Sequence, residues 1–482
     1  MTLAFLLALP VAGAGFCMWQ RALSRHSVAL LSTAVGHALL VGSMWVRGTS
    51  DATLGPLFAV DPLGLIVLSL SSLLFLVAAF SAVPYLLHAT HDPKAAPRVF
   101  VPCLLWFLAA MTVVATTQHL ALLWAAVEGT TLATAPLISF YRRRGALEAA
   151  WKYLILCSVG IAIALLGTFC LGVAADASGQ PASLLVNDLR RLAPSMPRSW
   201  LVASFVLALV GYGTKMGLAP MHSWLPDAHS QAPSPVSALL SGVLLNGAFL
   251  GVLRFYQVTL AAGDARFAQD LLLALGVLSM IFGVGLMSQQ RDYKRLFAYS
   301  SVENMGILAL GAGLGPLALA GTLFHMINHS LAKGALFLLS GNILRRFGTT
   351  QAPEVRGLQE AIPATAVLLV TALFAIGGVP PFSPFWSELL VVRAAVVAQH
   401  PAIAALVLFL LASGFLAGIA VVMPMLRGKP SLTGPAAPLE SWSSWLGPAL
   451  LCGALFTLGF YYPGWLDRTL GSAVAQFLPP NR

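Results

Sequence analysis

The stretch IPATAVLLVTALFAIGGVPPFSPFWSELLVV, residues 362–392, decides the fold. It exceeds the roughly 20 apolar residues that a helix needs to cross a membrane. Its middle reads GGVPP, residues 377–381, and a proline pair removes backbone donors and breaks a helix. A single acid, Glu388, follows the break. The stretch therefore predicts one discontinuous transmembrane helix that carries a carboxylate.

Apolar runs of this kind occupy most of the remaining chain. Of the 482 residues, 58% are apolar and 9% are charged, which excludes a soluble enzyme, a fibrous protein and a disordered chain. A second break is expected at Pro220, before a polar aromatic stretch at 222–229. The sequence thus predicts an all-α membrane protein with about 14 transmembrane helices, two of them broken. The other thirteen runs are 2–19, 28–46, 62–87, 99–116, 120–140, 147–174, 200–219, 235–253, 271–287, 296–314, 316–344, 402–426 and 445–462.

The net charge of +10 is spread in twos and threes of Lys and Arg between the apolar runs. This pattern is typical of loops that obey the positive-inside rule and not of a nucleic-acid binder. Loops after odd-numbered spans hold 15 basic residues and the other side holds nine, Arg254 among them. We therefore expect both termini on the non-cytoplasmic side, with no signal peptide removed. The 15 are Arg21, Arg25, Lys94, Arg98, Arg142, Arg143, Arg144, Arg291, Lys294, Arg295, Arg345, Arg346, Arg356, Arg427 and Lys429.

The five cysteines are far apart and form no CxxC pair. This spacing indicates neither a disulfide framework nor an iron-sulfur or zinc site. Any redox centre is therefore expected on another chain.

Apart from Glu148, at the very start of its run, six charged residues fall inside the predicted spans. Insertion scales assign each about 2.5 to 3.5 kcal/mol, so six unpaired charges cost roughly 15 to 20 kcal/mol, more than the net stability of a typical domain. Structural ion pairs that fix helix register are the alternative to function. The number and arrangement of the charges favour function. They are Glu128, Lys152, Lys215, Glu303, Lys333 and Glu388.

These charges repeat along the chain. Glu128 and Glu303 are 175 residues apart, Lys152 and Lys333 are 181 apart, and Lys215 and Glu388 are 173 apart. Spans four to eight and nine to thirteen each hold five helices, and an odd number predicts an inverted pair, as in many transporters. The expected divisions are three N-terminal helices in 1–98, a first repeat in 99–258, a second in 268–426, and a last helix with its tail in 427–482.

Three titratable residues share one face of span eleven. His325, His329 and Lys333 follow each other at intervals of four residues. A lone histidine is usually a satisfied core residue, but three such groups in a stripe favour stations on a proton path. A zinc site is disfavoured because no third ligand is evident and Lys333 would oppose a cation.

Several motifs resemble the antiporter-like subunits shared by respiratory complex I, Mrp-type cation/proton antiporters and membrane-bound group 4 [NiFe] hydrogenases. The most specific is GYGTKMGLAPMHSWLPDAHSQAPSPVSALLSG, residues 211–242. Others are FAVDPLGLIVLSLSS (58–72), KYLIL (152–156), HMINHSLAKGALFL (325–338) and GGVPPFSPFWSELL (377–390), so the resemblance covers essentially the whole chain. The details SGVLLNGA, SSVENMG and PPFSPFWSE resemble component F of hydrogenase-4.

The resemblance implies roles for individual residues. Glu128 and Lys215 would form the pair of the first half, Lys333 the central connector and Glu388 the terminal carboxylate. Asn246 and Ser241 depart from the family, since relatives place a lysine or a histidine there, and water would have to substitute. The full expected proton path is Glu128, Lys152, Lys215, His222, Asn246, Glu303, His325, His329, Lys333 and Glu388.

The environment of Glu388 gives two opposing expectations. Free backbone donors at the start of the second half-helix would favour its ionised form. Aromatic surface from Phe382, Phe385 and Trp386 would desolvate it.

Three functions remain open. The first is a proton- or sodium-translocating subunit of a hydrogenase or complex I-like redox pump in the cytoplasmic membrane of a prokaryote. The second is an Mrp-type cation/proton antiporter driven by ion gradients, and the third is a subunit that only supports assembly. The resemblance implies no cofactor on this chain, iron-sulfur clusters and a NiFe centre on partner subunits, and other antiporter-like subunits and a peripheral redox module as partners. The bilayer is expected around the chain, and no nucleic acid is expected.

Overall fold

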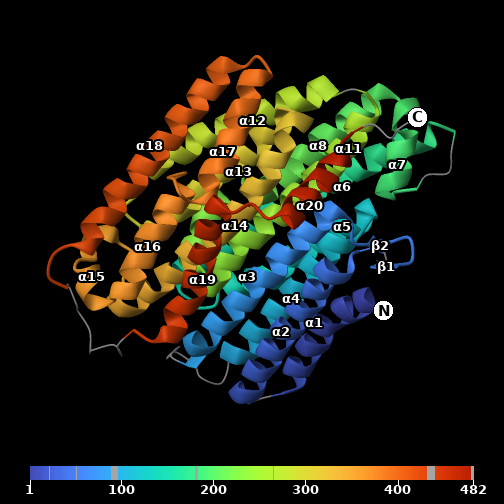
Figure 1. The fold of residues 1–482 in the computed structure, drawn as a ribbon. Coiled ribbons are helices and arrows are strands. Elements are labelled where there is room, and N and C mark those ends of the chain that lie inside the picture. The colour runs from blue at the N-terminus through green and yellow to red at the C-terminus, as the bar shows by residue number, and fades with distance from the viewer. Residues whose placement is uncertain are drawn as a thin grey trace.

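The structure, a computed structural model, describes residues 1–20, 22–49, 52–87, 96–179, 183–263, 265–430 and 440–478. The loop residues Arg21 and Lys94 of the charge count lie outside these ranges. Figure 1 shows long helices side by side in one elongated bundle, with the N-terminal helices at one end and α16–α18 at the other. The ends of the helices thus form two opposite faces of the bundle, one on each side of the expected bilayer.

The first part of the bundle runs from the N-terminus to the centre. A short antiparallel hairpin, β1 (Thr53–Leu54) with β2 (Phe58–Ala59), joins the second and third helices. The helices are α1 (Thr2–Trp19), α2 (Leu23–Arg47), α3 (Pro62–Leu87), α4 (Ala96–Thr116), α5 (Leu120–Ile138), α6 (Arg144–Asp176), α7 (Val186–Leu192), α8 (Arg198–Met216), α9 (Trp224–Gln231), α10 (Ser234–Leu239) and α11 (Leu245–Ala261).

The second part continues from the centre to the far end and back. Its last helix lies against α3 and against one of the long central helices. The helices are α12 (Ala265–Met287), α13 (Tyr293–Gly313), α14 (Pro316–Phe347), α15 (Leu358–Ala361), α16 (Pro363–Ile376), α17 (Ser383–Val397), α18 (Pro401–Leu426), α19 (Trp442–Phe460) and α20 (Gly464–Ala475).

The described part of the chain holds 11 helices that are long and apolar enough to cross a membrane. The helices α13 and α14 have the length but are more polar, and α16 with α17 makes a broken span. The predicted all-α membrane fold is therefore confirmed. The inverted relation of the two five-helix groups and the four divisions of the chain stay predictions.

Both predicted breaks are present. The helix α8 ends at Gly217, whose φ is 84°, and Gly378, with a φ of 65°, follows α16. Glycine adopts this left-handed backbone without a steric penalty, which other residues pay. Trp224 Nε1 donates a hydrogen bond of 2.8 Å to the carbonyl of Thr214 at the first break. One backbone acceptor that the break exposes is thereby satisfied.

Span eight is interrupted as well, which the sequence did not predict. A π-helical segment, Leu240–Leu244, lies between α10 and α11. Such bulges appear frequently at functional sites. The span containing it, Ser234–Ala261, is fully buried in the bundle, whereas α1 and α18 are mostly exposed. Ser241 and Asn246 consequently lie at the centre of the molecule.

The loop assignment of Arg254 is wrong. It is a buried residue of α11, and its guanidinium donates two hydrogen bonds, of 2.6 and 2.8 Å, to the carboxylate of Asp61. Burial alone would raise the pKa of Asp61, but Arg254 outweighs burial and holds that pKa below its usual value. The assignment failed because Arg254 lies near the end of an apolar run, where an arginine is usually exposed.

We expect Arg254→Ala to destabilise the fold by about 3 to 5 kcal/mol, because it leaves the Asp61 carboxylate buried without its partner. Chemical unfolding of the detergent-solubilised protein measures this change. The double variant Asp61→Ala/Arg254→Ala should be less destabilised, since no orphaned charge remains. Equal losses in the single and double variants would contradict this account.

Candidate proton path

Lys215 lies in the last turn of α8, just before the first break, and its side chain is fully buried. Its ammonium donates hydrogen bonds to Thr131 Oγ1 at 2.5 Å and to the Tyr153 hydroxyl at 2.9 Å. The nitrogen also lies 4.9 Å from the centroid of the Tyr153 ring. The C-terminal end of a helix favours a cation, and the hydroxyls and ring add to that effect. The site is therefore built to hold the charged lysine.

Glu128 of α5 is joined to Lys215 indirectly. Thr131 donates a hydrogen bond of 3.1 Å to one carboxylate oxygen of Glu128, and Ser158 donates one of 2.6 Å to the other. Among the described residues no direct ion pair joins Glu128 to Lys215. The two charges therefore belong to one network, but the Thr131 hydroxyl separates them.

Two hydroxyl contacts connect span eight to the second half. Asn246 donates a hydrogen bond of 2.6 Å to Ser330 Oγ on α14. Ser241, in the π-helical segment, lies 2.8 Å from Ser301 Oγ on α13. Asn246 Oδ1 is buried without a hydrogen-bond partner. Direct side-chain contacts therefore join span eight to α13 and α14 at Ser241 and Asn246.

Lys333 and His329 occupy the middle of α14 and are fully buried. The Lys333 ammonium donates one hydrogen bond, of 2.9 Å, to the carbonyl of Phe297. Among the described residues neither ring nitrogen of His329 has a hydrogen-bond partner in good geometry, although the backbone of Ser241 lies near the ring. Buried polar groups without protein partners are rare and are commonly served by water. These two side chains are consequently available to water at the centre of the bundle.

His325 stands in a fixed hydrogen-bond network one turn earlier on α14. Its ring nitrogens lie 3.0 Å from Asn304 Oδ1 and 3.1 Å from Ser387 Oγ. Asn328 donates a hydrogen bond of 3.0 Å to the same serine and accepts one of 2.7 Å from Ser383. The network ties α14 to α13 and to the beginning of α17, next to Glu388.

Of the two expectations for Glu388, the one that free backbone donors favour the ionised form needs correction, whereas its side chain is buried as the desolvation expectation requires. It is the sixth residue of α17 and lies beyond the free donors of the first turn, and its buried Oε1 has no hydrogen-bond partner. Its other oxygen lies against the second break, between α16 and α17. A Cβ built on Gly378 in this break would lie 2.0 Å from that oxygen. Trp386 is half exposed and donates a hydrogen bond to the Gly459 carbonyl, so this ring does not enclose the carboxylate.

Lys152 lies on the outside of the bundle, unlike the buried Lys215 and Lys333, and its expected depth in the membrane stays a prediction. It lies about two turns inside α6, is half exposed, and pairs with Glu148 at 2.7 Å and with Asp227 at 3.2 Å. Asp227 pairs at the same time with Arg295 at 2.5 Å. The three helices α6, α9 and α13 are thus joined at one face of the bundle.

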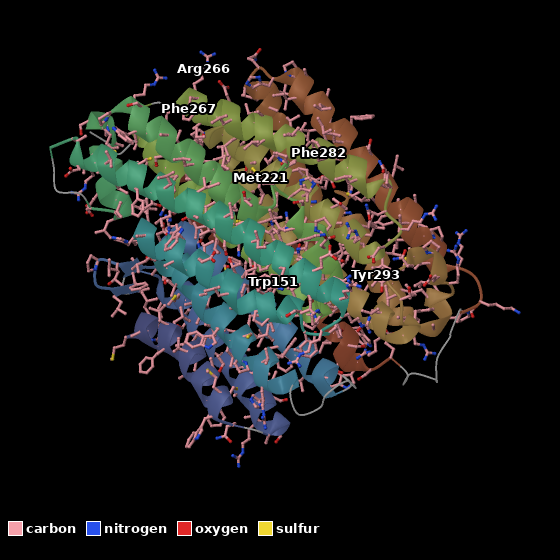
Figure 2. The ribbon with its side chains drawn as sticks, turned by 180° about the vertical axis from the view of Figure 1, so that it is seen from behind. Trp151, Met221, Arg266, Phe267, Phe282 and Tyr293 are labelled. Carbon is pink, nitrogen blue, oxygen red and sulfur yellow. The ribbon has the colours of Figure 1, made fainter. Side chains whose placement is uncertain are left out.

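His222 lies at the first break, mostly buried, and packs near the rings of Phe282 and Tyr299. Its Nδ1 has no hydrogen-bond partner. Figure 2 shows Met221 and Phe282 in this part of the bundle, with Arg266 and Phe267 toward one end of the helices. Nothing in the described contacts connects His222 with Lys215 directly.

The sequence interpretation missed two buried residues on the side where α13 begins. Lys294 was assigned to a loop, but it is fully buried and donates a hydrogen bond of 2.7 Å to the Ala232 carbonyl. His229 of α9 is fully buried, stacks on Phe337 with ring centroids 4.9 Å apart, and has no partner for either ring nitrogen. The charges of Lys294 and Lys333 both act on His229. The only available signal was the basic cluster at 291–295, which equally fits a loop.

The described residues include no group of three or more His, Cys, Asp or Glu side chains placed to hold a metal ion. The site therefore consists of lysines, carboxylates, histidines and hydroxyls in two groups. Glu128, Thr131, Tyr153 and Lys215 form the first group. The second group is formed by Glu303, His325, His329, Lys333 and Glu388, with span eight between them.

Known proteins resemble this chain in fold and in sequence. Residues 117–415 match the family model described as NADH:quinone oxidoreductase/Mrp antiporter, transmembrane. The hydrogenase-4 component F homolog of Methylacidiphilum infernorum is 36% identical over 417 residues, which cover 85% of this chain and 87% of that protein. The NADH-quinone oxidoreductase subunit N of Desulforudis audaxviator is 32% identical over 364 residues, covering 74% and 70% of the two chains.

The fold also matches a chain in the Mrp complex from Dietzia sp. DQ12-45-1b. The TM-score is 0.86 at 20% identity, with 98% of this chain and 97% of that chain covered. At this identity the likeness shows the fold alone, but the sequence matches extend further and confirm the resemblance inferred from the motifs. This chain belongs to the family of transmembrane subunits that NADH:quinone oxidoreductases and Mrp antiporters share.

Proposed function

We propose that this chain is a proton-translocating membrane subunit of a redox-driven complex of the hydrogenase-4 or complex I type. The hydroxyl-bridged Lys215–Thr131–Glu128 network carries the proposal. A fully buried lysine in the last turn of a broken helix, one side chain away from a carboxylate, can change both its partner and its proton with a small movement. A passive scaffold has no need for such a costly group.

The proposed cycle follows from what stabilises each charge. Contact with Glu128 favours the charged form of Lys215, whereas separation in a low-dielectric site favours loss of its proton. In this arrangement Thr131 holds the pair apart, and the first break gives α8 an end that can shift. A proton released there would pass beside Asn246 of span eight and Ser330 of α14 on its way to Lys333.

The proposed path in the second half runs along α14. Lys333 and His329 have free hydrogen-bonding capacity, and His325 reaches Ser387 beside Glu388. Lys294 and His229 offer a second route for protons to Lys333. This route starts at the beginning of α13, next to the loop that carries Arg291. In this proposal the beginning of α13 faces the cytoplasm, because the loops on that side hold most of the basic residues. Both termini of the chain then face away from the cytoplasm.

Partners and cofactors are part of the proposal. Relatives named as subunits of hydrogenase-4, of NADH-quinone oxidoreductase and of an Mrp complex support assembly with other antiporter-like membrane subunits. The redox groups, iron-sulfur clusters and a NiFe centre, would lie on a peripheral module. The setting would be the cytoplasmic membrane of a prokaryote.

The discriminating experiment uses the complex purified from membranes with its native partners and reconstituted in liposomes that contain a pH-sensitive dye. The proposal expects acidification or alkalinisation of the lumen when the electron donor is added, without any sodium gradient. An Mrp-type antiporter would instead move protons when a sodium gradient is imposed and no donor is present. Sodium-22 uptake with the donor would identify sodium as the transported ion. A complex without redox subunits would contradict the proposal.

Glu388 provides a test of the second half. Glu388→Gln keeps the shape of the side chain but cannot titrate, so we expect proton transport to fall by about 100-fold. Glu388→Asp should retain part of the activity, because it keeps the carboxylate. Dye-detected proton transport of the reconstituted complex measures both. Transport at the parental rate in Glu388→Gln would show that the residue is a structural hydrogen-bonding group.

A further inference from the structure

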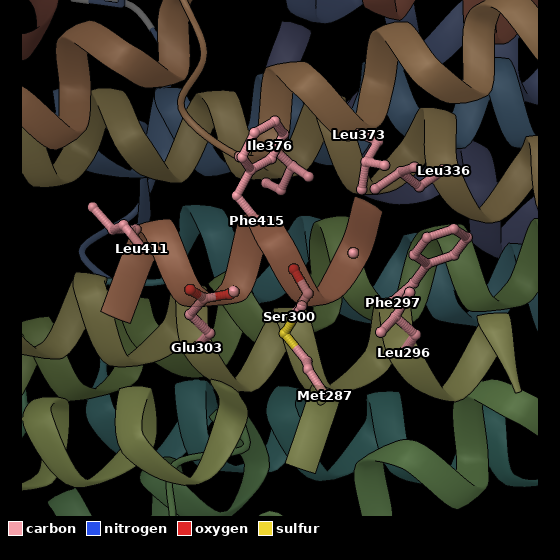
Figure 3. A pocket seen from close by; sticks show the side chains of 13 residues that line it. Met287, Leu296, Phe297, Ser300, Glu303, Leu336, Leu373, Ile376, Leu411 and Phe415 are labelled. Atoms are coloured by element: carbon pink, nitrogen blue, oxygen red, sulfur yellow. The ribbon is translucent and has the colours of Figure 1, made fainter. Parts of the chain in front are cut away.

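A small cavity runs along α13 between α14, α16 and α18 (Figure 3). Its volume is about 20 Å³, enough for at least one water molecule. Leu296, Ser300 and Glu303 line it from one face of α13, so it follows this helix for about 10 Å, at 1.5 Å per residue. Figure 3 shows Glu303 and Phe297 toward opposite ends of this row, with Ser300 between them. The cavity thus leads from near the beginning of α13 to a buried carboxylate.

Glu303 is the terminal group of this cavity. Its side chain is 5% exposed, and within the described part of the chain its carboxylate accepts no hydrogen bond from a protein group. The other polar side chain of the lining is Ser300. A carboxylate in this position exchanges its proton only with water in the cavity or with a titratable neighbour.

A glycine on α18 makes the space for the carboxylate. A Cβ built on Gly414 would lie 2.5 Å from Glu303 Oε1 and 3.0 Å from its carboxyl carbon. Contacts this close do not occur, so any larger residue at 414 must displace the Glu303 carboxylate. Gly414 thus leaves room for the carboxylate, and Gly283 of α12 leaves room for the backbone of the same residue, so the seat of Glu303 depends on positions that carry no charge.

The cavity lies beside the central connector. Phe297 lines it, and the carbonyl of the same residue accepts the hydrogen bond from Lys333 at 2.9 Å. The charge of Lys333 acts on Glu303. Asn304, the next residue of α13, is hydrogen-bonded to His325 at 3.0 Å. Lys333 therefore lies beside the cavity at Phe297, and Glu303, farther along α13, is next in sequence to the residue bonded to His325.

We propose that this cavity is a water-accessible entry to the second half and that Glu303 is its proton-loading carboxylate. A proton from the aqueous phase, relayed by water in the cavity, converts the Glu303 carboxylate to the carboxylic acid. Among the described residues no ion pair joins Glu303 to Lys333, so water in the cavity then carries this proton from the acid to the neutral amine of Lys333, which regenerates the carboxylate and forms the ammonium. The mostly apolar lining would limit hydration and so gate entry. The inference rests on the proposed proton transport and adds to it a route that the family motifs do not include.

The test is a double-mutant cycle in the reconstituted complex with its partners present. Gly414→Ala should lower proton transport per electron by about tenfold or more, because a misplacement of ~1 Å at a reacting group can cost ~100-fold. Glu303→Asp, one methylene shorter, should keep part of the activity. The same Gly414→Ala change made in the Glu303→Asp background should cause little further loss, since the clash is relieved. Gly285→Ala on α12, where a Cβ meets nothing within 4 Å, is the matched control.

Two results would overturn the entry route. One is parental transport in both Gly414→Ala and Glu303→Gln, while Lys215→Met is inactive. The other is an equal loss from Gly414→Ala in both backgrounds, which would indicate a packing defect unrelated to the carboxylate. Parental transport in Lys215→Met would instead show that the proposed function itself fails. The two failures are therefore distinguishable.

Discussion

Lys215→Met is expected to lower proton transport by about 100-fold or more while the subunit still inserts and assembles. Methionine has nearly the length of lysine and fills the same buried space, but it can neither carry a charge nor donate to Thr131 and Tyr153. Without that charge the Glu128 carboxylate has no counter-ion to exchange. Proton transport by the reconstituted complex, with co-purification of the partner subunits as the check of assembly, measures the effect.

Two variants make this result interpretable. Lys429→Met removes an exposed lysine of a loop and should transport protons at the parental rate. Thr131→Val removes the bridging hydroxyl but keeps both charges, so it should slow transport without abolishing it. Undiminished transport in a correctly assembled Lys215→Met complex would eliminate the switch and favour a subunit that only supports assembly.

Lys333→Ala is expected to have an effect of similar size. Its ammonium has one hydrogen bond, to a backbone carbonyl, so nothing in the described structure replaces it when it is lost. His325→Ala should be milder, because Asn304 and Ser387 remain and water can fill the space between them. The measurement is the same transport assay on both variants. If His325→Ala were more severe than Lys333→Ala, the connection would not be centred on the lysine.

The sequence predicted the features that depend on composition and on helix breakers. Lys215, Lys333 and Glu388 are buried because long apolar runs surround them, and the breaks occur where glycine and proline remove regular hydrogen bonds. The grouping of Lys215 with Glu128 of α5 followed from the resemblance, which did not include the hydroxyl of Thr131 between them. These parts of the site are local in sequence or carried by motifs.

Other features depend on tertiary contacts that no local pattern records. Lys152 is exposed because its partner Asp227 lies 75 residues away at the surface. Lys294 is buried with its ammonium hydrogen-bonded to the carbonyl of Ala232, at the end of α9 and 62 residues away. The hydroxyl of Thr131 lies between two charges only because α5 and α8 both pack on α6. An ordinary threonine in an apolar helix gives no signal of this role.

The contact of Asp227 with both Lys152 and Arg295 has a mechanical consequence. The helix α9 is the second half of the broken span, and this one carboxylate anchors it to α6 on one side and to α13 on the other. Any displacement of α9 must therefore pull on both α6 and α13 or release one of the two anchors. The anchors are partly exposed, so dissolved salt weakens them while the buried charges remain shielded from it. We therefore expect high ionic strength to weaken the coupling of α9 to α6 and α13.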